Sequence, residues 1–212
     1  MDFGLRALRI VVAVLLLVPL LALASVAAAD SRKPANGGPY LIGQFLVATQ
    51  KLDDPRFVKT VIYMVEHNDS GAFGLIVNKR STVPVLMSTI LNELGIAAVN
   101  DDYEVRLHYG GPVDPGRLFV LHSGEYMSPG TNPVDDTISL TTQRSVFEAF
   151  AAGAGPKRAL FALGYAGWGP GQLEGEIARG DWLSAPATEP VIFDDDNDSK
   201  WERASDGAGL KL

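Results

Sequence analysis

"VKTVIYMVEHNDSGAFGLIVN", residues 58–78, is the stretch that best indicates how this chain folds. Val58 to His67 and Ala72 to Asn78 are rich in β-branched, aliphatic and aromatic residues, which favour strands. Asn68 to Gly71, "NDSG", separates them with residues that suit tight turns. Two strands joined by so short a connection predict a β-hairpin.

Further strands are expected on both sides of this hairpin. Apolar runs with β-branched or aromatic residues predict them at residues 40–49, 103–109, 117–123 and 157–165, and at Pro190 to Phe193. Each run is short and is bounded by residues such as glycine, proline or aspartate. The sheet is therefore expected to draw strands from nearly the whole length of the chain.

Three helices are expected between the strands. A stripe of apolar side chains predicts the first, with Thr82 as its N-cap and Gly95 at its end. The second covers residues 142–153, and the third follows a glycine-rich segment. "DDPRF" predicts one further helical turn, capped by Asp53. Hairpin strands beside helix-linked strands indicate a mixed sheet and the α+β class rather than a doubly wound sheet.

The glycine-rich segment invites a comparison with phosphate-binding loops. In the G-x-G-x-x-G pattern a third glycine lets a helix pack tightly. Counted from Gly167, that position holds Gln172, and counted from Gly169 it holds Glu174. Glu174 and Glu176 would also occupy the positive end of the helix dipole, where a phosphate would meet two carboxylates. The segment is not expected to bind phosphate.

The same segment is expected to bring two backbones close together, with Trp168 and Trp182 packed as wedges. Indole rings bury large areas but need an acceptor for their N–H groups. An alternative stays open. If the segment is exposed, Tyr165, Trp168, Gln172 and Glu174 have the mixed aromatic and polar character of a partner-binding groove.

Residues 1–29 resemble an export signal. They open with two arginines, continue with an uncharged apolar stretch and close on Ala27 and Ala29, which fit a signal-peptidase site before Asp30. The expected product is an exported, periplasmic protein. Retention as an inner-membrane anchor is the first alternative, and a downstream translation start, which would leave a cytoplasmic protein, is the second. Residues 30–39 are expected to be a flexible linker.

Composition limits the possible partners and chemistry. The chain has no cysteine, so disulfides, thiolate metal sites and a cysteine nucleophile are excluded. Its formal net charge is −7 and no run of lysine and arginine interrupts it, so direct nucleic-acid binding is not expected. Acidic residues crowd residues 194–212, which are expected to form an acidic tail with a short helix around Trp201.

A few polar residues are candidates for chemistry. Glu66, His67 and His122 could serve acid–base catalysis in a hydrolase if the fold brought them together. His122 and Ser123 are neighbours in a predicted strand, so their side chains should point to opposite faces and cannot form a catalytic pair. The three histidines lack metal-ligand spacing, and no metal or other cofactor is expected.

Three blocks of the sequence are similar to signature blocks of the AlgH/YqgE family of bacterial proteins: "LDDPRFVKTVIYMVEHNDSGAFGLIVN", "YGGPVDPGRLFVLHS" and "LGYAGWGPGQLEGEIARGDWL". The resemblance covers about residues 40–193. It implies an α+β fold whose largely antiparallel, bifurcated sheet curls into a pseudo-barrel with about three packed helices. It also implies the family's usual label, transcriptional regulator, without an established reaction.

The sequence departs from the family pattern at three points. The usual Arg-Pro after the hairpin is Lys79–Arg80, and a usual aspartate at the start of the second helix is Ser145. Family members are also normally cytoplasmic, whereas this chain begins with a leader. That last departure argues against a direct role on DNA.

The favoured hypothesis is a non-catalytic binding or regulatory module that acts on an unknown protein partner through a groove. Candidate groove residues are Asn68, Asn78, Gly110, Gly111, Tyr165, Trp168, Gln172 and Glu174. A hydrolase that uses Glu66, His67 and His122 is the alternative from a different class. A DNA-binding regulator is disfavoured by the acidic charge and the leader.

Overall fold

The computed structural model describes residues 40–97 and 102–210. The expected signal peptide (1–29) and linker (30–39) lie outside the described residues. Within the described ranges, no helix has both the length and the apolar character needed to cross a membrane.

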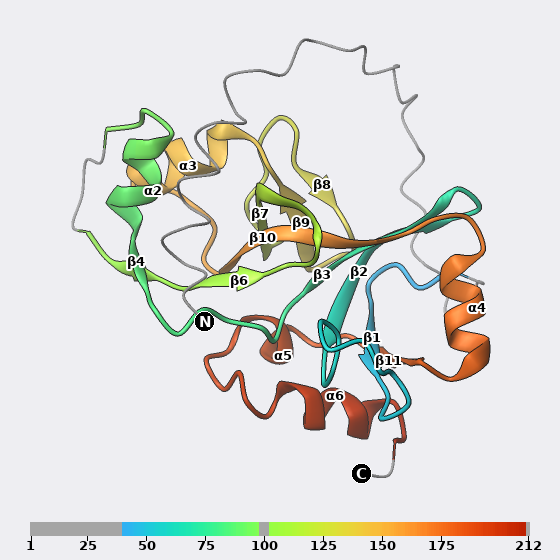
Figure 1. The fold of residues 1–212 in the computed structure, drawn as a ribbon. Helices are drawn as coiled ribbons and strands as arrows, with labels where there is room; N and C mark the ends of the chain where they lie inside the picture. The colour runs from blue at the N-terminus through green and yellow to red at the C-terminus, as the bar shows by residue number, and fades with distance from the viewer. Residues whose placement is uncertain (1–39, 98–101, 211–212) are drawn as a thin grey trace.

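The described residues form eleven strands. Their bounds are β1 (Gln44–Ala48), β2 (Val61–Asn68), β3 (Gly71–Ile76), β4 (Val85–Leu86), β5 (Glu104–Val105), β6 (Leu107–Tyr109), β7 (Val113–Ser123), β8 (Asn132–Pro133), β9 (Ile138–Thr141), β10 (Ala159–Trp168) and β11 (Trp182–Pro186). Nine of them make one sheet in the order β11-β1-β2-β3-β10-β7-β9-β8, with β6 beside β10 (Figure 1). β4 and β5 form a separate pair.

The sheet divides at β10. The first part of β10 pairs with β7 on one side and with β6 on the other, and Ala166 to Trp168 pair with β3. The β6–β10 pair is parallel, and the other described pairs are antiparallel. The whole sheet curls into a half-barrel (Figure 1). The predicted hairpin, β2–β3, and the predicted α+β class with a mixed, bifurcated sheet are confirmed.

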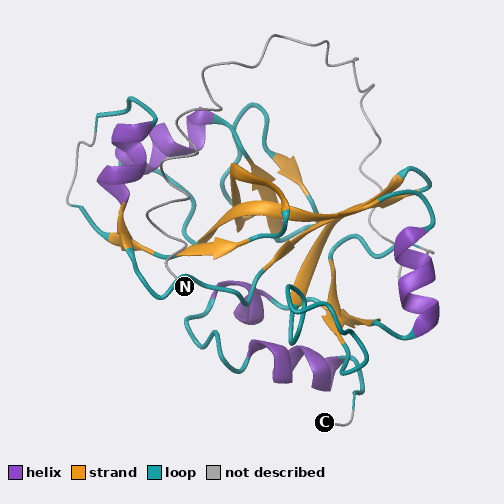
Figure 2. Ribbon diagram, viewed as in Figure 1, coloured by secondary structure: helices purple, strands orange, loops and turns teal. Residues whose placement is uncertain are grey.

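Within residues 40–97 and 102–210, five helices rather than about three lie around the sheet: α2 (Met87–Glu93), α3 (Arg144–Ala151), α4 (Gln172–Arg179), α5 (Glu189–Phe193) and α6 (Lys200–Gly207). Figure 2 shows α2 and α3 together at one end, α4 at the other, and α5 with α6 along a third side. The predicted strand at Pro190 to Phe193 is wrong, because this segment is α5. Its proline stands in the first turn, where the missing N–H costs nothing.

Two predicted helix starts are also wrong. The first helix begins at Met87 instead of following Thr82, because Val85 and Leu86 pair with β5 as β4. The "DDPRF" segment forms hydrogen-bonded turns, and the carboxylate of Asp54, rather than that of Asp53, accepts the N–H of Arg56 at 2.9 Å. In this strand Val85 pairs with Val105 and packs beside an apolar cluster, which favours β structure over a longer helix.

The inner face of the half-barrel carries the main core. Side chains from β1, β2, β3, β7, β9 and β10 meet there with those of α5 and α6. A second cluster lies between α2, α3 and the β6–β10–β7 part of the sheet. A third covers the outer face of β1, β2, β3 and β10, where α4 and β11 add Leu173 and Trp182. The fold is therefore one body with apolar layers on both faces of its sheet.

The C-terminal helix belongs to the core, which the expectation of an acidic tail did not foresee. Trp201 is buried and its indole N–H donates to the carbonyl of Ala48 at 2.9 Å. Lys200 is 1% exposed, and its Nζ donates to the carbonyls of Ile192 at 2.8 Å and Val77 at 3.3 Å. Burial lowers the pKa of Lys200 to about 8. These bonds fasten α5 and α6 to the sheet.

Candidate functional site

A bulge in β2 places the side chain of Glu66 on the inner face of the half-barrel. The register of β2 against β3 shifts between Met64 and Glu66, and Glu66 lies opposite Phe73. Val65 already contributes to the inner core, as Phe73 does from the neighbouring strand. One extra residue in a strand puts two consecutive side chains on the same face. Glu66 therefore joins the inner face, and His67 turns to the outer one.

A second bulge, in β10, turns Tyr165 to the same inner face. The register of β10 against β7 shifts between Leu163 and Tyr165, at Gly164. Gly164 has φ +70°, and a Cβ there would lie 2.5 Å from the carbonyl oxygen of Gly111, so only glycine fits. Leu163 packs into the cluster under α2 and α3, whereas Tyr165 packs against the inner core.

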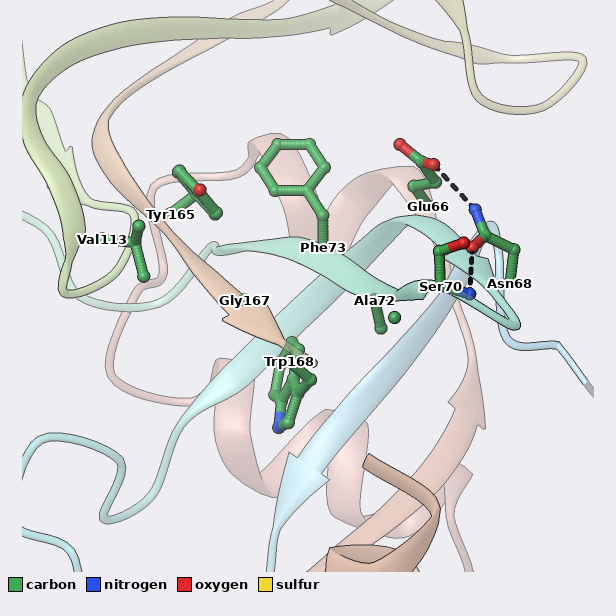
Figure 3. A pocket seen from close by; sticks show the side chains of 10 residues that line it. Glu66, Asn68, Ser70, Ala72, Phe73, Val113, Tyr165, Gly167 and Trp168 are labelled. Atoms are coloured by element: carbon green, nitrogen blue, oxygen red, sulfur yellow. Dashed lines mark hydrogen bonds between the residues drawn. The ribbon is translucent and has the colours of Figure 1, made fainter. Parts of the chain in front are cut away.

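Two adjoining pockets open beside these bulges, and we call them together the trough. Their volumes are about 390 Å³ and about 320 Å³, and both are lined by Phe73 and Tyr165. The first is also lined by Glu66, Asn68, Ser70, Gly71, Ala72, Val113, Gly167 and Trp168, and the second by Arg117, Phe119, Gly130, Asn132, Leu140, Thr141 and Thr142. Figure 3 shows Glu66, Phe73 and Tyr165 standing on one side of the sheet.

Three aromatic rings separate the two halves of the trough. The ring centroids of Phe73 and Tyr165 are 4.9 Å apart. The ring centroid of Phe119 lies 5.7 Å from that of Phe73 and 5.9 Å from that of Tyr165. Both Tyr165 pairs meet edge to face, an arrangement that stabilises aromatic contacts. We call these rings the ridge, and an apolar group of a ligand could pack over them.

The trough also holds two opposite charges. Glu66 lines the first half, and its Oε1 accepts the side-chain N–H of Asn68 at 2.8 Å. Arg117 lines the second half, with its guanidinium 5.1 Å from the centroid of Phe119. Among residues 40–97 and 102–210, neither Glu66 nor Arg117 has an ion-pair partner.

Behind the trough, α4 holds the two tryptophans of the glycine-rich segment. The indole N–H groups of Trp168 and Trp182 both donate to Oε2 of Glu176, each at 2.8 Å. Oε1 of Glu176 accepts the side-chain amide of Gln172 at 3.0 Å. The two indole rings meet edge to face at 6.1 Å. The predicted wedges thus share one carboxylate, and nothing in the sequence pattern identifies Glu176 as their acceptor.

His67 lies on the α4 side and binds Glu174. Its Nδ1 accepts the backbone N–H of Leu41 at 3.1 Å, which leaves Nε2 as the donor to Oε1 of Glu174 at 2.8 Å. The ring of Tyr40 packs edge-on against the imidazole at 5.2 Å. Two hydrogen bonds to the carboxylate of Glu174 lower its pKa. The larger effect comes from the backbone N–H of Glu174 itself and the smaller from His67. His67 is 2% exposed and joins α4 to the start of the sheet.

The structure does not join the three candidate catalytic residues. No hydrogen bond connects any two of Glu66, His67 and His122 among the described residues. His122 is fully buried, its Nδ1 bonds the carbonyl of Ser123 at 3.0 Å, and burial lowers its pKa. The Ser123 hydroxyl donates to Glu125 instead of to a histidine. Nor do the described residues contain a group of three or more potential metal ligands.

The predicted groove residues fall into four places: the trough, α4, the start of the hairpin and a segment packed against β10. Asn68, Tyr165 and Trp168 line the trough, and Gln172 and Glu174 lie on α4 with the contacts given above. Asn78 binds backbone groups of Val61 and Lys59, which fixes the start of the hairpin. Phe73, Arg117 and Phe119 also line the trough and were not predicted, because only the bulges reveal which face they share.

Gly110 and Gly111 lie against β10 rather than in the trough lining. A Cβ at Gly111 would stand 2.0 Å from the carbonyl carbon of Tyr165, and a Cβ at Gly110 would stand 2.2 Å from the carbonyl oxygen of Gly164. Real side-chain atoms do not approach so closely. The expected close approach of two backbones is confirmed at this crossing, where glycines face each other from both segments.

Comparison with known proteins identifies the family. A family model described as AlgH-like matches residues 45–212. The chain belongs to the AlgH-like family. A UPF0301 protein of Methylococcus capsulatus is 47% identical over 170 residues, which cover 80% of this chain and 92% of that protein. A UPF0301 protein of Agrobacterium fabrum is 46% identical over 168 residues, covering 76% and 83%.

Two solved structures share the architecture. The solution structure of the AlgH protein from Pseudomonas aeruginosa is similar with a TM-score of 0.70 and 34% identity, over 87% of this chain and 95% of that one. A crystal structure of a Corynebacterium diphtheriae protein has the same fold at 20% identity and a TM-score of 0.61, over 78% and 86%. Both bulges, the trough and α6 lie inside the AlgH-like match.

Proposed function

We propose that this AlgH-like protein is a non-catalytic binding module, and that its trough docks a segment of a protein partner. The observation that carries the proposal is the pair of bulges. Without them Glu66 and Tyr165 would point to the opposite face of the sheet, away from Phe73. Bulges recur where a strand must aim a side chain into a functional site.

The character of the trough supports a protein ligand. Aromatic residues and arginine are enriched where proteins bind one another, and Phe73, Phe119, Tyr165 and Arg117 line this surface. A formal net charge of −7 and the carboxylate of Glu66 would repel a nucleic-acid backbone.

Two features argue against assigning acid–base chemistry to the trough. Glu66 is the acidic side chain in its lining, but the residue beside it, His67, points to the other face and is engaged with Glu174. His122 is buried and is not part of the lining. A catalytic pair needs its members within hydrogen-bond reach or one water apart.

Site-specific photo-crosslinking in living cells tests the proposal. A photoreactive amino acid replaces Val113, an exposed trough residue, and in a matched strain replaces Val58, which is exposed elsewhere. We expect one reproducible protein adduct when the photoreactive residue is at position 113 and none when it is at position 58. The adduct at position 113 should be lost in the Glu66→Lys variant and kept in the Glu93→Lys variant. No adduct, or the same adducts at both positions, would refute it. Trp168→Ala is a poor probe because it also removes one of the two indole donors to Glu176.

A further inference from the structure

We infer that the trough selects a peptide segment with a basic side chain on one side of an apolar one and an acidic side chain on the other. The inference rests on the proposed function and defines the chemistry of the partner. The basic side chain would lie beside Glu66, the apolar one over Phe73 and Tyr165, and the acidic one beside Arg117.

The acidic end of the trough is oriented before any ligand arrives. Oε1 of Glu66 is held by the amide of Asn68, and Oδ1 of Asn68 in turn accepts the backbone N–H of Ser70 at 2.8 Å (Figure 3). The hairpin turn therefore fixes the carboxylate through Asn68. No described residue binds Oε2 of Glu66. A carboxylate positioned in this way, with one oxygen free, suits an ammonium or guanidinium group.

The basic end is prepared in a different way. The guanidinium of Arg117 packs over the ring of Phe119, which restricts its orientation. To the described part of the chain it makes one long hydrogen bond, from Nη2 to the Thr142 hydroxyl at 3.5 Å. A planar guanidinium with several uncommitted donors can hold a carboxylate through two parallel hydrogen bonds. Since Arg117 has no carboxylate partner among the residues that the structure describes, we assign that role to the ligand.

The ridge sets the middle of the ligand. Phe73 and Tyr165 belong to both halves of the trough, so a chain that reaches from Glu66 to Arg117 must cross them. An apolar side chain there would bury aromatic surface that is now partly exposed. A peptide with a single kind of charge would satisfy one end and meet a like charge at the other.

Fluorescence anisotropy with synthetic peptides tests this selectivity. Each labelled peptide carries Leu-Phe-Leu between two charged residues, with glycine spacers of increasing length, and three versions carry Lys and Glu, Glu and Glu, or Lys and Lys. We expect the mixed version to bind roughly tenfold more tightly than either uniform version at its best spacing. Direction along the trough is left free, because the mixed peptide can bind either way round.

Charge reversal decides the assignment of each end. Glu66→Lys should move the preference to the Glu and Glu peptide, and Arg117→Glu should move it to the Lys and Lys peptide. Glu93→Lys and Lys51→Glu make the same changes of net charge outside the trough and should leave the preference unchanged. Equal affinity for all three versions, absence of binding, or a shift in the control variants would overturn the inference. Val113 crosslinking would then still decide the proposed function separately.

Discussion

Replacing Glu176 with alanine should lower the free energy of unfolding by about 3 kcal/mol. The substitution removes one carboxylate oxygen that accepts the indole N–H groups of both Trp168 and Trp182. Trp182 is 1% exposed and Trp168 is 8% exposed, so neither indole can turn to bulk water without moving its ring. The loss would loosen α4, β10 and β11 at once.

The magnitude follows from the two hydrogen bonds. A hydrogen bond to a charged group contributes about 1.5–3 kcal/mol net, so two of them contribute about 3–6 kcal/mol. Glu176 itself is half-buried, and water that enters in its place would recover part of this free energy. We therefore expect the lower end of the range. Glu176→Gln keeps one acceptor oxygen and should cost about 1 kcal/mol, because its uncharged oxygen accepts more weakly.

Urea unfolding followed by tryptophan emission measures the effect, since two of the three tryptophans share this contact. Glu93→Ala is the control: Glu93 lies exposed on α2 without a described partner. Its midpoint should match that of the unchanged protein. If Glu176→Ala unfolds within about 1 kcal/mol of Glu93→Ala, the shared carboxylate does not hold the indoles as described.

Three further predictions concern other parts of the chain. Burial lowers the pKa of Lys200 from 10.5 to about 8, so between these pH values the unfolded chain binds more protons and the unfolding free energy rises with pH. Urea titrations at pH 8 and 10 should show that Lys200→Met lacks this gain, a difference of about 2–3 kcal/mol; parallel pH profiles would contradict it. Gly111→Ala should lower the free energy of unfolding by more than about 3 kcal/mol in thermal unfolding, because its Cβ would stand 2.0 Å from Tyr165. Gly175→Ala lies inside α4 with its nearest contact at 3.6 Å, and it should raise the free energy of unfolding by about 0.5–1 kcal/mol. Similar melting points for these two variants would show that the strand crossing tolerates a side chain. N-terminal sequencing of the protein from fractionated native cells should find a periplasmic chain that begins at Asp30, and an uncut cytoplasmic chain would contradict export.

The sequence predicted the central strands and the class because their signals are local, but it missed β4, β8, β9 and β11. Turn residues between two β-prone runs specify the hairpin, and residues 142–153 carry a helical apolar stripe that the structure contains as α3. Residues 190–193 misled because Val191 and Ile192 favour strands by composition. These two residues are buried against the core and Pro190 stands in the first turn, which favours the helix α5 over a strand. Tertiary packing outweighed a weak local preference there.

The candidate site could be predicted only in part. Strict alternation along β2 would place His67 on the inner face with Val65 and would turn Glu66 outward. The bulge reverses both, and no residue type between Met64 and His67 announces it. At β10 a signal did exist, because Gly164 interrupts an apolar strand, which is where bulges occur. A bulge predicted at that glycine would have placed the side chains of Leu163 and Tyr165 on opposite faces of the sheet.

The place of β10 in the chain has a consequence for synthesis. β1, β2 and β3 leave the ribosome early. The free edge of β3 pairs with β10 and the free edge of β1 pairs with β11, and both partners are made late. Until those late segments emerge, the nascent chain carries apolar strands with open edges, the kind of template on which other chains aggregate. Contacts so distant along the polypeptide also make folding slow. These strand edges are therefore covered only when almost all of the chain has been made.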